Sequence, residues 1–206
     1  MTTLLQRALP IAMAFVLSAC AALVNAPAYS VYDLGRVSAV PAAPSTVVPA
    51  AVEVRAPSWL ATSAMQYRLD YARPASREAY AESRWAGHPA EMLQRQLTAM
   101  LVDGAHRSGA CRLRIELDEF VQSFESVEDS RAELAARAML VGPRNGAVLA
   151  RRVFTTRVPA PAADARGGVQ AHREAVVAFG RELSTWLDGL DGAPGREGSI
   201  GERCRS

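Results

Sequence analysis

The spacing of apolar residues along this chain switches between the period of a strand and the period of a helix. Alternating or β-type runs predict seven strands, near residues 29–34, 52–55, 65–71, 78–83, 112–128, 131–141 and 148–158. Helical spacing predicts one helix from Pro89 to about Gly104 and a second over about 163–190. The predicted order is β-β-β-β-α-β-β-β-α, a single α/β domain in which a mixed β-sheet packs against two main helices.

The fifth predicted strand changes the face of its apolar residues part of the way along. Leu113 and Leu117 share one face, whereas Phe120 and Phe124 have the opposite parity. One extra residue in a strand shifts the parity of everything after it. The sequence therefore predicts a β-bulge near 118–119.

The segment 131–141 fits two kinds of secondary structure. Ser130 and Glu133 have the spacing of a capping box, and the composition that follows favours a helix. The same residues also alternate between apolar and polar, which is typical of a half-buried strand. Turn residues at 73–76 and 142–146 join the flanking runs as hairpins. We interpret 131–141 as a strand that pairs with 148–158.

The first twenty residues have the pattern of a lipoprotein export signal. Arg7 gives a positive start, Ala8–Leu17 is uncharged and too short to span a bilayer, and the tetrad Leu17-Ser-Ala-Cys20 is a lipobox. The alternative is an ordinary secretory signal in which Cys20 is incidental. We predict a signal peptide over 1–19 and an N-terminal lipid, palmitate included, on Cys20.

The residues after the lipobox indicate where the lipoprotein would reside. Residues 20–28 predict a lipidated tether, and no later apolar segment is long enough to cross a membrane. Ala21 stands where an Asp would retain many lipoproteins in the inner membrane. We therefore expect an outer-membrane location, with the domain at 29–190 facing the periplasm.

Charge and lysine content exclude several classes of function. The net charge is only +2 at pH 7, and no clustered basic face predicts a nucleic-acid partner. All 23 basic residues counted as lysine or arginine are arginine. Without lysine the chain can form neither a Walker A loop nor a Schiff base. An energy-driven process served by this protein needs a different ATPase subunit.

Two cysteines remain once Cys20 carries a lipid. Cys111 and Cys204 would form a disulfide in an oxidising compartment. The alternative is a buried thiol at Cys111 and a loose thiol near the C-terminus. Residues 191–206 are rich in Gly and polar residues and predict a flexible C-terminal tail, unless Cys204 fixes them.

No set of residues predicts a catalytic or metal site. His88, His106 and His172 do not stand at metal-ligand spacing, and no nucleophile motif is present. Glu116, Asp118 and Glu119 form a carboxylate cluster, which we interpret as the solvent face of a strand. We expect a protein that is not an enzyme and that holds neither a metal nor a cofactor.

Several short motifs, taken in order, resemble those of one known family. They are Tyr32-x-Leu34, then Val52-x-Val54-x-x-Pro57-x-x-Leu60 with Met65-x-Tyr67-Arg68, then Arg84-Trp85-Ala86 before Pro89, and the run 112–120. Together with the lipobox they resemble the ABC-type transport auxiliary lipoproteins, the PqiC-like partners of MCE-domain transport systems. The resemblance covers about 29–190, and it favours a strand at 131–141. The chain departs from the family pattern at Gly87-His88 and at Trp59.

The resemblance implies an accessory role in lipid transport between membranes. Such systems contain an ABC ATPase, a permease and a periplasmic MCE protein. The lipoprotein would sit on the inner leaflet of the outer membrane, as a possible homo-oligomeric ring, and dock the MCE assembly there. The family has no catalytic group.

Two groups of residues are candidates for the partner interface. One is the apolar turn of Pro57, Trp59 and Leu60, and the other is the pair Arg84 and Trp85 before the first helix. Large aromatic residues and arginine are enriched in interface hot spots. The alternative for both groups is ordinary core packing.

Two other functions remain open from the sequence. One is a non-enzymatic plug or pilotin for a different outer-membrane assembly. The other is a periplasmic lipid-binding carrier, which would need an apolar cavity.

Overall fold

The structure is a computed structural model that describes residues 28–36, 47–102, 109–143, 146–191, 194–195 and 198–205. The predicted signal peptide, Cys20, Gly104 and His106 lie outside these ranges. The order of the main elements is the predicted one, β-β-β-β-α-β-β-β-α. The prediction of a single α/β domain with a mixed sheet and two main helices is confirmed.

Seven strands form one mixed sheet. Its order is β1-β4-β3-β5-β6-β7, with β2 also paired to β5. The strands are β1 (Ser30–Tyr32), β2 (Ala51–Arg55), β3 (Ala64–Leu69), β4 (Arg73–Trp85), β5 (Arg112–Phe124), β6 (Ser130–Val141) and β7 (Val148–Pro159).

The long strand β5 organises the sheet because two strands share one of its edges. The first half of β5 pairs in parallel with β2, and its last three residues pair in parallel with β3. The chain between these two neighbours contains the short 3-10 helix η2 (Ser58–Leu60). The other edge of β5 forms an antiparallel hairpin with β6 along its whole length.

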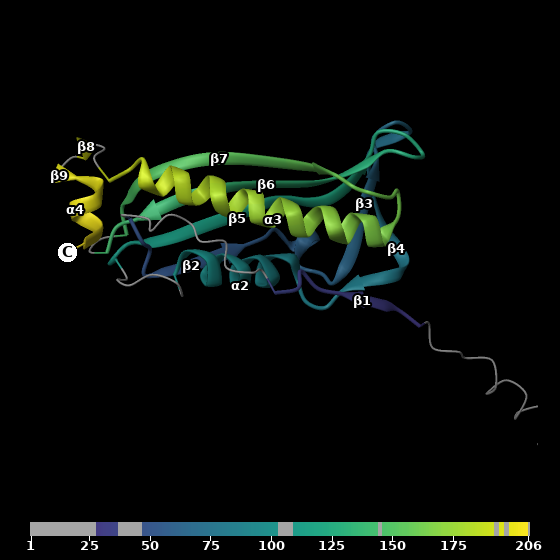
Figure 1. Cartoon of the computed structure of the whole chain (residues 1–206), viewed down its shortest axis with the longest axis horizontal. Helices are drawn as coiled ribbons and strands as arrows, with labels where there is room; N and C mark the ends of the chain where they lie inside the picture. The colour runs from purple at the N-terminus through teal and green to yellow at the C-terminus, as the bar shows by residue number, and fades with distance from the viewer. Residues whose placement is uncertain are drawn as a thin grey trace, which may run out of the picture.

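Two helices cover one face of the sheet, as Figure 1 shows. Helix α3 (Ala165–Asp188) packs on β6 and β7, and α2 (Pro89–Leu101) packs on β2 and on α3. Asp164 caps α3, since its carboxylate accepts a hydrogen bond from the Gly167 amide at 2.7 Å. The face toward the helices carries the large buried residues of β5, whereas Arg114 and Glu116 on the opposite face are partly exposed. We call this opposite face the open face, although Val121 and Ser123 near the end of β5 are buried on it.

Both predictions that rested on parity are confirmed. The pairing of β5 with β6 shifts between Leu117 and Glu119, which is the predicted bulge. The segment predicted as strand over 131–141 is β6, and every second residue from Ala132 to Leu140 is fully buried. β6 pairs with β5 on one edge and with β7 on the other. This pairing outweighs the local helix propensity, because a helix at 131–141 would leave backbone groups of β5 and β7 without hydrogen-bond partners.

The turn predicted at 73–76 is wrong. The chain turns at 70–72, and Arg73 already begins β4. The register then passes from Arg73 opposite Leu69 directly to Glu78 opposite Tyr67. Pro74 is accommodated because residues 74–77 bulge out of the regular ladder, where an amide hydrogen is not needed.

The C-terminal segment is folded where the structure describes it. Residues Ile200–Arg205 form helix α4, after the short strands β8 (Pro194–Gly195) and β9 (Gly198–Ser199). Ile200 and Cys204 are buried, and the Ala110 amide donates to the Cys204 carbonyl at 2.6 Å. The prediction of a flexible tail is therefore corrected, and the reason is the attachment of Cys204 to the sheet.

Candidate functional site

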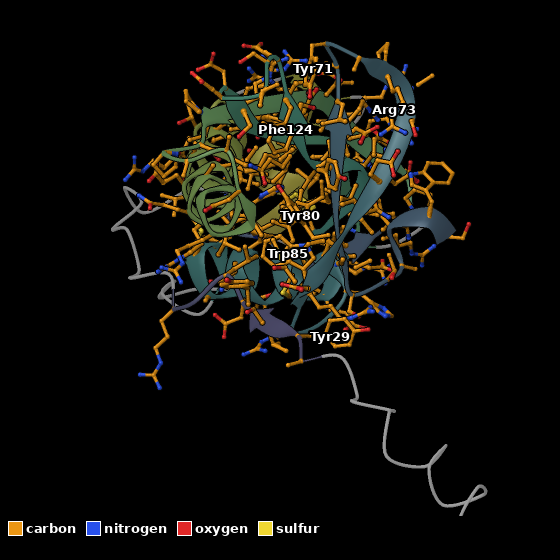
Figure 2. All side chains as sticks on the ribbon, turned by 90° about the vertical axis from the view of Figure 1, so that its right-hand side faces the viewer. Tyr29, Tyr71, Arg73, Tyr80, Trp85 and Phe124 are labelled. Atoms are coloured by element: carbon orange, nitrogen blue, oxygen red, sulfur yellow. A yellow bond between two sulfur atoms is a disulfide. The ribbon has the colours of Figure 1, made fainter. Side chains whose placement is uncertain are left out.

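The segment formed by Tyr29 and the strand β1 exposes two large side chains at one end of the sheet. Tyr29 is 38% exposed and Val31 is 64% exposed. The guanidinium carbon of Arg84 lies 4.0 Å from the centre of the Tyr29 ring, a cation–π contact. Figure 2 shows Tyr29 beside β1, at the margin of the molecule.

The register of three strands explains why these residues lie on one face. Val31 is opposite Arg84, and Arg84 is opposite Ala64 on the other side of β4. Side chains directly opposite each other in a sheet point to the same face. Val31, Arg84 and Ala64 therefore form a row on the open face, away from the two helices.

The turn that contains η2 separates its two large apolar residues. Pro57 directly precedes η2. Within η2, Trp59 is 56% exposed whereas Leu60 is 1% exposed. The side chain of Gln66 donates a hydrogen bond to the Trp59 carbonyl at 2.8 Å. Gln66 also accepts a hydrogen bond from Arg77 on the open face. Trp59 is thus held at the border of the open face while Leu60 anchors the turn in the core.

Trp85 is a core residue. It is 3% exposed, and its ring lies 5.6 Å from Phe120 and 5.4 Å from His172. The neighbouring residue Arg84 has the opposite parity on β4 and points to the open face. In Figure 2 Trp85 lies inside the molecule, between the helices and the sheet.

The predicted interface residues therefore divide into two groups. Leu60 and Trp85 are buried, and core packing explains their presence. The prediction that these two side chains contact a partner is therefore wrong. Trp59, Arg84 and the partly exposed Pro57 remain available on the surface.

The sequence reasoning did not single out Tyr29 and Val31 as surface residues. The signal was present, because Tyr29 directly precedes the short strand β1 and Val31 lies on it, two residues further along the chain.

The carboxylate cluster has the structural role that the sequence predicted. Arg137 binds both Glu116 and Asp118, with closest distances of 3.1 and 2.8 Å. Glu119 accepts hydrogen bonds from Arg68 and Arg77, the closest at 2.7 Å. Each acid of the cluster is thus engaged by an arginine on the open face of the sheet. Ion pairs near the surface, such as those of Arg137, contribute little to stability.

A buried polar cluster joins the start of α3 to the sheet. The Tyr80 hydroxyl donates to Gln122 Oε1 at 2.9 Å, and Gln122 Nε2 donates to Ser130 Oγ at 2.8 Å. Burial raises the pKa of Tyr80, so its hydroxyl stays protonated. A Cβ atom added at Gly168 would collide with the Gln122 amide. The close approach of helix and sheet here gives the cluster a structural role.

His172 is buried in the same region, and its environment does not suit catalysis. The residue is 2% exposed, Nδ1 donates to the Gly168 carbonyl at 2.7 Å, and Nε2 has no partner among the described residues. Burial lowers the pKa of His172 to about 4. The imidazole is therefore neutral at physiological pH.

The buried neutral His172 predicts a loss of stability in acid. Its folded pKa of about 4 lies below the ordinary 6.5, so the unfolded chain binds the proton more tightly. Stability is then lost as pH falls from about 6.5 to 4, by up to about 3 kcal/mol. We expect His172→Leu to lose less stability than the wild type between pH 7.5 and 4.5, measured by urea unfolding. The exposed His88, replaced by Gln, is the matched control. Equal losses in wild type and His172→Leu would contradict this prediction.

Two further findings concern chemistry and anchoring. Among the residues that the structure describes, no group of three or more His, Cys, Asp or Glu side chains could hold a metal ion. None of the described helices is long and apolar enough to cross a membrane. Cys20, the predicted lipidation site, lies outside the described residues, so its modification stays a prediction.

The structure contains one disulfide, between Cys111 and Cys204. It links the start of β5 to α4, across 93 residues of sequence, and both cysteines are buried. Figure 1 places α4 at the opposite end of the long axis from β1, so the disulfide lies far from β1.

Comparison with solved structures supports this fold. Protein XCC0632 from Xanthomonas campestris matches with a TM-score of 0.66 at 21% identity, over 80% of this chain and 99% of that chain. An uncharacterised protein matches with a TM-score of 0.58 at 12% identity, over 78% of this chain and 99% of the other. At these identities the likeness shows the fold alone.

A family model carries the comparison further. No curated protein matches this chain. The model of the ABC-type transport auxiliary lipoprotein component matches residues 32–184, which is most of the chain and includes the whole sheet from β2 to β7. The chain therefore belongs to the family of ABC-type transport auxiliary lipoprotein components.

Proposed function

We propose that this protein is a lipid-anchored accessory subunit of an MCE/ABC-type intermembrane lipid transport system. It sits on the inner leaflet of the outer membrane and docks the periplasmic MCE assembly there. The family match over 32–184 carries the proposal, because it names an auxiliary lipoprotein of ABC-type transport. The absence of lysine agrees with a role in which the ATPase and the permease are separate subunits.

The lipobox supports the membrane anchor. Cys20 follows three residues of the expected type, and Ala21 lacks the charge of an inner-membrane retention signal. A tether of nine residues from 20 to 28 reaches at most about 30 Å when fully extended. The end of the domain that carries β1 is therefore kept within about 30 Å of the membrane. The partner would bind surfaces of the domain that stay exposed when the end with β1 lies this close to the membrane.

Trp59 is our first choice for contact with the MCE partner. It is a large apolar side chain on a turn that the core holds through Leu60, and it is 56% exposed. Rigid aromatic side chains of this kind often dominate interface energies, at about 2 kcal/mol or more. Pro57, beside Trp59 on the same turn, and Arg84 on β4 are partly exposed and would contribute less.

Replacement of Cys20 tests the anchor. We expect Cys20→Ala to be absent from the membrane fraction and to lose incorporation of labelled palmitate, because the lipid supplies the stable attachment. Density-gradient separation of inner and outer membranes then locates the wild-type protein. Retention of Cys20→Ala in the outer membrane would contradict the anchor, and wild-type protein in the inner membrane would contradict the sorting.

Recovery of partners tests the transport role. Wild-type protein with a C-terminal tag is purified from solubilised membranes, and its partners are identified by mass spectrometry. We expect an MCE protein together with an ATPase and a permease. Trp59→Ala should recover at least about tenfold less of the MCE protein, which corresponds to the loss of one interface hot spot. The conservative Trp59→Phe serves as the matched control.

Other results point to the other functions. Recovery of unrelated outer-membrane assembly proteins alone would contradict the transport role and support a plug or pilotin. Lipid bound in stoichiometric amount to the Cys20→Ala protein would support a carrier.

A further inference from the structure

The strand β7 ends the sheet on one side and leaves a long edge open. It runs for 12 residues from Val148 to Pro159, and among the described residues no other strand pairs with its outer edge. The register with β6 is continuous from Ala150 to Pro159, so no bulge turns this edge away. An exposed edge of this length can accept another strand.

The ladder with β6 shows which backbone groups point outward. The Ala160 amide donates to the Ser130 carbonyl at 2.8 Å, which fixes the even-numbered residues as those that face β6. Hydrogen-bonded and non-hydrogen-bonded pairs alternate along an antiparallel ladder. The amide and carbonyl groups of Arg151, Val153, Thr155 and Arg157 therefore point to the open edge. Pro159, which has no amide hydrogen, falls in this outward series, where prolines are tolerated.

The side chains on this edge carry only one sign of charge. The strand contains Arg151, Arg152 and Arg157 and no acidic residue. Arg157 is paired with Glu133 at 2.9 Å, and Arg152 lies over the Phe154 ring. Arg151 has no ion pair in the part of the chain that the structure describes. Val153, between these arginines, is 69% exposed and adds an apolar contact.

We propose that the edge of β7 binds an extended acidic segment of a partner polypeptide, which adds to the sheet as a further strand. The outward backbone groups would supply the hydrogen bonds, and acidic side chains would pair with Arg151 and Arg152 on the two faces. Strand addition of this kind obtains affinity from the main chain and specificity from alternate side chains. The binding does not depend on a lipid anchor.

In the register centred on Phe154, the same charges disfavour a second copy of this chain as the occupant. If two β7 strands paired antiparallel around Phe154, Arg151 would lie opposite Arg157 of the other copy. Like charges directly opposite each other destabilise a pair of strands. The strand β1 of a second copy offers only three residues, Ser30–Tyr32, and none is acidic. An acidic strand from a different protein meets neither obstacle.

A synthetic peptide tests this proposal on the full-length protein purified in detergent. The probe is a labelled, end-capped peptide that alternates Glu and Val, and the control peptide has Lys in place of Glu. Binding is measured by fluorescence anisotropy at low and high salt. We expect the acidic peptide to bind at least about tenfold more tightly than the basic one, and more weakly at high salt.

Two variants separate the backbone from the charges. Thr155→Pro removes an outward amide hydrogen while the ladder to β6 is kept, and we expect about tenfold weaker binding. Thr155→Ala keeps that amide and is the matched control, expected to bind within about twofold of wild type. The double variant Arg151→Glu/Arg152→Glu keeps the backbone intact and should bind the basic peptide in preference to the acidic one.

Hydrogen exchange locates the contact. The bound acidic peptide should slow exchange of the amides of Arg151, Val153, Thr155 and Arg157, which are open in the protein alone. Equal binding of the two peptides, no detectable binding of the acidic peptide, or protection elsewhere but not on β7 would overturn the proposal.

Discussion

Removal of the disulfide by Cys111→Ala with Cys204→Ala should lower the free energy of unfolding by about 4–5 kcal/mol. The bond closes a loop across 93 residues, and it restricts the unfolded chain more than a short loop would. It also fixes α4, whose buried Ile200 would otherwise lose its attachment to the sheet. Equilibrium unfolding in urea, followed by circular dichroism, measures the difference.

Two comparisons control this experiment. Cys20→Ala removes the remaining cysteine and leaves the disulfide, so its unfolding free energy in detergent should match that of the wild type. Wild-type protein with a reductant present should approach the double variant. A double variant as stable as the wild type would show that the bond does not contribute to the stability of the fold.

Truncation of Trp85 should be nearly as costly as loss of the disulfide. We expect Trp85→Ala to lower the free energy of unfolding by about 3–5 kcal/mol, since it leaves a cavity among Phe120, His172 and the end of β4. The Trp85 amide also donates to the Ser63 carbonyl at 2.8 Å, so the cavity lies next to a strand junction. Urea unfolding at neutral pH gives the value.

The exposed Trp59 offers a matched control for Trp85. Trp59→Ala removes the same side chain from the surface, and we expect a change within about 0.5 kcal/mol. Trp59→Ala should lower the recovery of the MCE protein although its free energy of unfolding is nearly unchanged. A loss of stability then does not explain the lower recovery. Similar destabilisation by both variants would show that the burial assigned to Trp85 is wrong.

The nature and order of the elements followed from local patterns. Alternation over 112–128 and 131–141, with helical spacing after Pro89 and after Ala163, was enough to predict the main strands and helices in order. Alternation and helical spacing are properties of neighbouring residues, because each element buries one face. The bulge before Phe120 was predictable for the same reason, since it reverses a parity that is visible in the chain.

The pairing of the strands was not predictable in this way. Nothing local indicates that β2 and β3 share one edge of β5, or that β1 pairs with the end of β4. These pairings join segments far apart in sequence, and their choice depends on which arrangement buries both helices against one face. The turn at 70–72 was misplaced because Pro74 is a turn signal locally but is tolerated in a bulge.

The candidate site shows the same division between sequence and structure. The sequence by itself showed the absence of lysine and the presence of Trp59 and Trp85 beside short motifs, and it predicted the lipidation of Cys20. Only the tertiary structure decided that Trp59 is exposed while Trp85 is core, and that Cys204 lies against Cys111. The physical reason is that a residue's type records what it prefers, whereas burial depends on distant segments that pack over it.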